Sequence, residues 1–142
     1  MRLLAALTLL TLATMAWAGP IKTIKIDPEP VPCNGEHREE KVVNTKGSTI
    51  YVKQVHLWQR VTGPAFGFAD VTRDSGTGRQ IILFGRWVYP SVEYPVVVNF
   101  APDSVPVASD EALVLIQGCH GTEEQAGLVV QSVAMIWYTE TP

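Results

Sequence analysis

The sequence predicts an all-β protein, folded as a single antiparallel β-sandwich of about eight strands. Residues 19–142 contain 18 Val and 8 Ile against 5 Leu, and branching at Cβ suits a pleated sheet better than a helix. Ten Pro and eleven Gly interrupt the chain at short intervals. The apolar runs between these breaks recur roughly every 8–12 residues, which is typical of sandwiches and barrels.

The chain of 142 residues is long enough for one domain. Its 14 acidic and 11 basic side chains give a formal net charge of −3. Because Lys and Arg are scattered and do not form a basic excess, a nucleic-acid partner is not expected.

Residues 1–18 have the pattern of a signal peptide. Arg2 precedes an apolar run of 13 residues, and Ala16 and Ala18 form a small-x-small cleavage site before Gly19. The run is too short to be a typical membrane span. We therefore expect a secreted or periplasmic product that begins at Gly19 and has no membrane span after cleavage.

Residues 19–32 form a Pro-rich N-terminal segment, and the sandwich domain is expected over 33–142. The spacing of Ile21, Ile24 and Ile26 is compatible with a short edge strand. The alternative is a linker, since Pro28, Pro30 and Pro32 favour an extended, polyproline-like chain. The polar residues 34–40 are expected to form a loop.

Strands are expected at 41–45, 49–60, 66–72, 80–84, 96–100, 112–117 and 127–138. The runs 49–60, 112–117 and 127–138 are apolar on both faces, which indicates central positions in their sheets. The run 80–84 is expected to be a short buried strand, and 102–106 a loop. Residues 122–126 could form one helical turn at most. The strand spacing is typical of immunoglobulin-like and jelly-roll sandwiches alike.

Cys33 and Cys119 are the two cysteines of the chain, and in an exported domain an even number predicts a disulfide. The bond would close a loop of 86 residue steps, worth roughly 4–5 kcal/mol by the chain-entropy estimate. The alternative is a metal site, because His37 and His120 lie close to the two cysteines in sequence. Thiolate and imidazole ligands suit zinc or copper.

The metal interpretation is the weaker one, because the spacing does not match a structural zinc finger and neighbouring Cys and His rarely point at one metal. No metal or other cofactor is therefore expected. His56 is expected to be partly buried in a strand, on the same face as Val52 and Trp58.

Three aromatic residues, Trp87, Tyr89 and Tyr94, lie within eight positions and are interleaved with Pro90 and Pro95. Stiff amphipathic rings bury area at low entropy cost, so this segment is the candidate binding site. The alternative is that Trp87 and one Tyr cap the core at a sheet corner. Trp58 and Trp137 lie in apolar strands and are expected in the core.

The function expected from these features is that of an exported, non-enzymatic binding module. It would recognise a carbohydrate or a protein partner through its loops. The runner-up is an extracytoplasmic copper- or zinc-handling protein that uses His37 and His120 with Cys33 and Cys119. A small secreted hydrolase is third, because no pair of carboxylates and no nucleophile motif stands out.

Overall fold

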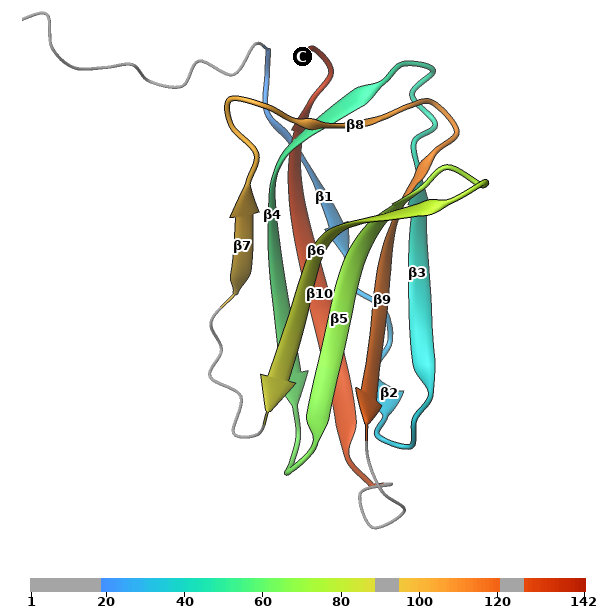
Figure 1. Cartoon of the computed structure of the whole chain (residues 1–142), viewed down its shortest axis with the longest axis vertical. Coiled ribbons are helices and arrows are strands. Elements are labelled where there is room, and N and C mark those ends of the chain that lie inside the picture. Colours follow the sequence, from blue (N-terminus) through green and yellow to red (C-terminus); the bar gives the residue numbers. More distant parts are fainter. Residues whose placement is uncertain (1–18, 89–94, 121–126) are drawn as a thin grey trace, which may run out of the picture.

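The computed structural model of the chain describes residues 19–88, 95–120 and 127–142, with the side chains of Trp87 and Val88 excepted. Two antiparallel sheets pack face to face (Figure 1). The predicted β-sandwich is therefore confirmed, with ten strands in the described residues instead of about eight.

Sheet A has the strand order β1-β10-β4-β7, with β2 also paired to β10 and β8 to β4. Its strands are β1 (Lys22–Ile26), β2 (Val31–Pro32), β4 (Ile50–Val61), β7 (Val96–Asn99), β8 (Val105–Val107) and β10 (Val129–Thr139). Sheet B has the order β3-β9-β5-β6. Its strands are β3 (His37–Val43), β5 (Phe66–Asp74), β6 (Arg79–Val88) and β9 (Ala112–His120).

The three runs that are apolar on both faces, β4, β9 and β10, all lie inside their sheets, as predicted. Between the sheets they bury a core that includes Ile26, Val55, Leu57, Leu115 and Ile136, all fully shielded from solvent. On the faces turned away from the core, most side chains of these three strands are half-buried or buried as well.

The Pro-rich N-terminal segment contributes to the sandwich. β1 is the short edge strand that the Ile spacing suggests, and it pairs along its length with β10. β2 also pairs with β10. Cys33 follows directly and is bonded to Cys119 in β9, with the two Cα atoms 4.6 Å apart. The disulfide prediction is confirmed, and the bond ties the start of β3 to the neighbouring strand.

Two segments expected to be loops contain strands. β3 begins at His37, within the polar run 34–40, because its backbone pairs with β9 from Gly118 onward. β8 lies partly within 102–106 and pairs with β4 through Val105, Pro106 and Val107. The possible helical turn at 122–126 lies outside the described residues. Within the described part of the chain, no helix is long and apolar enough to cross a membrane.

Candidate functional site

The aromatic segment selected from the sequence falls largely outside the described residues. The backbone of Trp87 belongs to β6 and pairs with Gly67. The side chain of Trp87, and the whole of Tyr89 and Tyr94, lie outside what the structure describes. Their assignment as a binding site therefore stays a prediction.

The two histidines of the metal alternative lie at strand ends beside the disulfide. His37 begins β3 and is exposed. His120 ends β9, where its ring lies 5.3 Å from the Phe68 ring and 6.2 Å from the Phe66 ring. Both cysteine sulfurs are bonded to each other, and the described residues hold no group of three His, Cys, Asp or Glu suited to a metal.

Trp58 and Trp137 do not lie in the core, and His56 shares a face with Trp58, as predicted, but not with Val52. The register with β10 passes from Gln54 to Val52, so Lys53 is an extra residue, a β-bulge. The bulge reverses the alternation: Val52 is buried in the core, whereas His56 points to the outer face of sheet A. There its ring lies 4.5 Å from that of Trp137 and 5.7 Å from that of Trp58.

The two tryptophans are half-buried on this outer face and are not core residues. Successive side chains of a strand point to opposite faces of the sheet. Because Leu57 and Ile136 face the core, the adjacent Trp58 in β4 and Trp137 in β10 face outward. His56 is partly buried, as predicted. Its Nε2 atom is shielded from solvent and has no hydrogen-bond partner in the described structure.

β6 forms one edge of sheet B and presents an apolar surface. Ile81 and Phe84 are each 60% exposed. They occupy one face of the strand because Ile82 is an extra residue in the register with β5. The six residues from Gln80 to Gly85 carry no charge. The sequence predicts a buried strand over 80–84, and the structure corrects this to a ten-residue edge strand with two exposed apolar side chains.

Arginines flank this apolar stretch at both ends. The Arg86 guanidinium donates a 2.8 Å hydrogen bond to Asp70 and lies over the rings of Phe68 and Phe84, at 5.4 and 5.7 Å. Arg79 donates to both carboxylate oxygens of Glu39 in β3, at 2.7 and 2.8 Å. The second pair spans the sheet, since β9 and β5 lie between the two strands.

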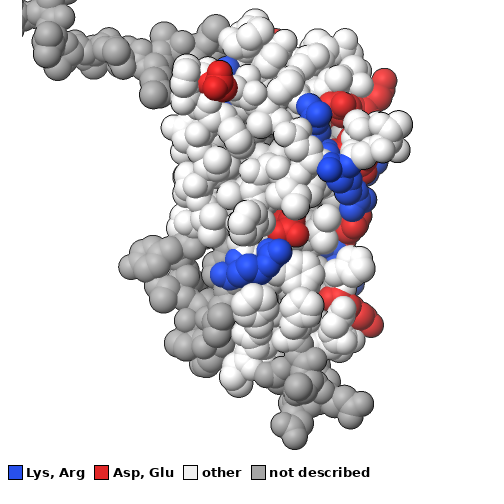
Figure 2. Space-filling view, in the orientation of Figure 1, with Lys and Arg blue, Asp and Glu red and all other residues white. Residues whose placement is uncertain are grey.

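Charge is distributed unevenly over this face. Most charged side chains gather on the side where β3 lies, whereas the rest of this face is uncharged apart from one blue and red group near its centre and one red group at its upper left (Figure 2). Large apolar areas on the surface of a small domain commonly mark interaction sites. The β6 edge is therefore the first candidate surface, which we define by Ile81, Phe84 and the backbone of residues 80–85.

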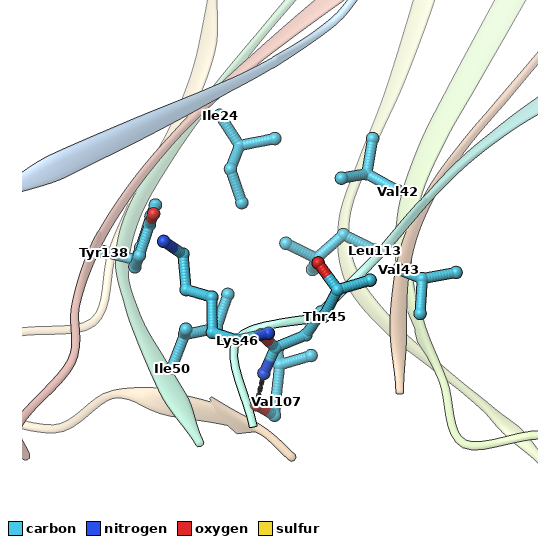
Figure 3. A pocket seen from close by; sticks show the side chains of 10 residues that line it. Ile24, Val42, Val43, Thr45, Lys46, Ile50, Val107, Leu113 and Tyr138 are labelled. Carbon is cyan, nitrogen blue, oxygen red and sulfur yellow. Dashed lines mark hydrogen bonds between the residues drawn. The ribbon is translucent and has the colours of Figure 1, made fainter. Parts of the chain in front are cut away.

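The second candidate is a pocket between the two sheets, at the end of the sandwich that β8 crosses (Figures 1 and 3). Its volume is about 200 Å³. Its wall is mainly aliphatic: Ile24, Val42, Val43, Ile50, Val107 and Leu113. Thr45 and Lys46, from the loop between β3 and β4, and Tyr138 in β10 add polar atoms (Figure 3).

Asn44 fixes the loop that shapes this pocket. Its side-chain amide nitrogen donates to the carbonyls of Ser48, Val107 and Ala108 at 2.8–3.1 Å. Its side-chain oxygen accepts a hydrogen bond from the backbone N–H of Lys46. A buried amide with this many partners holds the loop against β8.

Lys46, which lines the pocket, belongs to an ion cluster. Glu140 Oε1 lies 2.8 Å from Lys22 Nζ and 3.2 Å from Lys46 Nζ. The hydrogen bonds from the two lysines lower the pKa of Glu140 below its usual range. The hydrogen bond to Glu140 raises the pKa of Lys46, and a smaller contribution in the same direction comes from Tyr138. Lys46 Nζ also lies 5.8 Å from the centre of the Tyr138 ring.

Sequence reasoning did not find these two candidate surfaces. A short apolar run such as 80–84 has the same pattern whether its strand is buried or at an edge. The pocket joins residues from β1, β3 and the loop after it, β4, β8, β9 and β10, so it depends on the strand order. No protein-family model matches the chain, and no curated protein is found to be similar to it.

Proposed function

We propose that this chain is a non-enzymatic binding module that acts outside the cytoplasm and engages a protein partner along the β6 edge. The observation that carries the proposal is the pair Ile81 and Phe84, each 60% exposed on an edge strand. An edge strand offers unpaired backbone N–H and C=O groups, which a second extended chain can bind by strand addition.

A protein partner accounts for this surface better than a carbohydrate. A sugar that stacks on an aromatic ring also needs nearby polar side chains for its hydroxyl groups. The guanidinium beside Phe84 is already engaged, because Arg86 donates to Asp70 and to the carbonyl of Gly85. Backbone pairing, together with an apolar contact at Ile81 and Phe84, needs no further polar group.

The proposed compartment rests on two features. Residues 1–18 have the pattern of a signal peptide. The Cys33–Cys119 disulfide is compatible with an oxidising environment. Together they support a secreted or periplasmic protein.

The other two functions gain no support from the described residues. Metal handling by His37 and His120 with Cys33 and Cys119 would require the disulfide to be reduced before the sulfurs could act as thiolates. For a hydrolase, three carboxylates of sheet B, those of Glu39, Asp70 and Asp74, are engaged in ion pairs with arginines.

The test is affinity capture from an extract of the native envelope or medium, using the wild type and the double variant Ile81→Lys/Phe84→Lys. Val97→Lys is the matched control, because Val97 is 45% exposed on β7, an edge strand of the other sheet. We expect one protein to bind the wild type and the control but not the β6 variant. The variants should remain folded, since exposed substitutions change stability by only about 0.5 kcal/mol.

Hydrogen exchange on the purified complex then identifies the mode of binding. Strand addition should slow the exchange of the backbone amides of residues 80–85 and leave those of β7 unchanged. A partner that is retained equally by the β6 variant would overturn the proposal. So would a glycan that binds through Phe84 without any protection of the β6 amides.

A further inference from the structure

The pocket at the β8 end has the size of one small apolar group. Its volume is about 200 Å³, and a cavity of about 150 Å³ is enough to hold a benzene ring. Drug-sized ligands occupy larger sites of roughly 300–1,000 Å³. A phenyl ring or a short acyl chain would therefore fill this pocket, and most of its wall would be aliphatic.

The ammonium group of Lys46 lies beside Tyr138 on one side of the pocket, 5.8 Å from the centre of its ring (Figure 3). Thr45, from the same loop between β3 and β4, lies on the side of Leu113 and Val43 (Figure 3). A ligand with an apolar body and a polar end would place the two parts against the matching sides. The charge of that polar end has to match the charged side chains around Lys46.

The ion cluster that includes the lining residue Lys46 favours an anion. The ammonium groups of Lys22 and Lys46 share one carboxylate oxygen of Glu140, so the three side chains carry a net charge of +1. Lys22 is the closer partner, at 2.8 Å against 3.2 Å for Lys46. Glu140 can therefore keep its bond to Lys22 while Lys46 turns to an incoming anion.

From this charge complementarity we propose that the pocket binds a small amphipathic carboxylate, with its apolar end among Ile24, Ile50 and Leu113 and its carboxylate on Lys46. The site is separate from the β6 edge and does not depend on the function proposed for that edge. A charge-assisted hydrogen bond from Lys46 supplies the selectivity for an anion, and the aliphatic wall limits the size of the apolar end.

The probe is phenylacetate, with phenylacetamide as its neutral counterpart, followed by methyl NMR of the purified protein. Phenylacetate should shift the methyl signals of Ile24, Ile50 and Leu113 in a saturable manner. The methyls of Val61 and Val130, which are buried outside the pocket lining, should not move. Phenylacetamide should bind at least tenfold more weakly, and added salt should weaken the binding of phenylacetate.

Two charge variants should change the affinity in opposite directions. Lys46→Gln should lower the affinity for phenylacetate about tenfold, because the cationic partner is lost. Glu140→Gln should raise it several-fold, because Lys46 is released from its carboxylate. Lys25→Gln is the matched control, since Lys25 is paired with Asp27 and does not line the pocket.

The apolar side is tested by Ile24→Phe, whose larger side chain would fill part of the cavity and should abolish the methyl shifts of Ile50 and Leu113. Thr23→Phe is its control, on the exposed face of the same strand. Equal binding of the acid and the amide, an unchanged affinity in Lys46→Gln, or a lower affinity in Glu140→Gln would each overturn the proposal. An absence of saturable shifts in the wild type would overturn it as well.

Discussion

The two edges of sheet B differ in chemistry although they border the same sheet. β3 begins with five consecutive polar or charged residues, His37 to Lys41, whereas β6 has six uncharged residues from Gln80 to Gly85. Charged side chains on an edge strand discourage pairing with another chain. One edge of sheet B therefore carries charge that discourages pairing and the other carries an uncharged stretch, and this contrast supports the proposal of a partner at β6.

The difference extends to how each edge is held. β3 is tied to β9 by the disulfide that precedes it and by seven backbone pairs. β6 is held through β5, in a hairpin whose tip leans across β9 towards β3 (Figure 1). The Arg79–Glu39 pair joins the hairpin to β3. Three double variants and a change of pH test the difference between the two edges.

The largest effect is expected from the double variant Cys33→Ala/Cys119→Ala. Loss of a native disulfide from a small domain costs about 2–5 kcal/mol of unfolding free energy, which urea titration would measure. Native-state hydrogen exchange should become faster in β3 than in β6, because β6 keeps its local hairpin. If hydrogen exchange became faster by the same factor in β3 and in β6, the disulfide would not be the cause of the difference in stability between the two edges.

An intermediate effect is expected when the chemistry of the edges is exchanged. Ile81→Lys/Phe84→Lys should reduce self-association at high protein concentration, measured by light scattering, with little change in unfolding free energy. His37→Val/Lys41→Val should increase self-association, because it removes charge from β3. Similar scattering from both double variants would mean that edge charge does not control pairing here.

The smallest effect is expected from pH at the tip of the β5–β6 hairpin. The hydrogen bonds from Arg79 lower the pKa of Glu39, and the backbone N–H of Gly76, helped by Lys41 and Arg79, lowers that of Asp74. Groups with a lowered folded-state pKa stabilise the fold above their unfolded pKa of about 4, and this contribution is lost as pH falls through the folded value.

Amide exchange at residues 75–80, corrected for its intrinsic pH dependence, should therefore accelerate as the solution becomes more acidic than about pH 4. Glu39→Gln should remove much of this acceleration. If the amides of residues 75–80 in the wild type were equally protected above and below about pH 4, the ion pairs would not be what holds the hairpin to β3.

The sequence predicts the parts of this fold that depend on composition and local pattern. The sandwich follows from the excess of Val and Ile and from the frequent Pro and Gly. The central places of β4, β9 and β10 follow from runs with no polar face. The disulfide follows from two cysteines behind a predicted signal peptide.

The features that the sequence does not predict depend on long-range pairing. The polar run at His37 becomes a strand because β9 supplies its backbone partners. The single extra residue at Lys53 moves Trp58 and His56 to the outer face of sheet A. The exposure of Ile81 and Phe84 is decided by the strand order, which places β6 at an edge.

The last strand of the chain is the organising strand of sheet A. β10 pairs with β1, β2 and β4, so β1 and β2 have no sheet partner until residues 129–139 have been synthesised. Contacts between such distant segments give a high contact order, which slows folding. Sheet A should therefore close only after β10 has been synthesised, and a chain that lacks residues 129–139 should leave β1 and β2 without a partner.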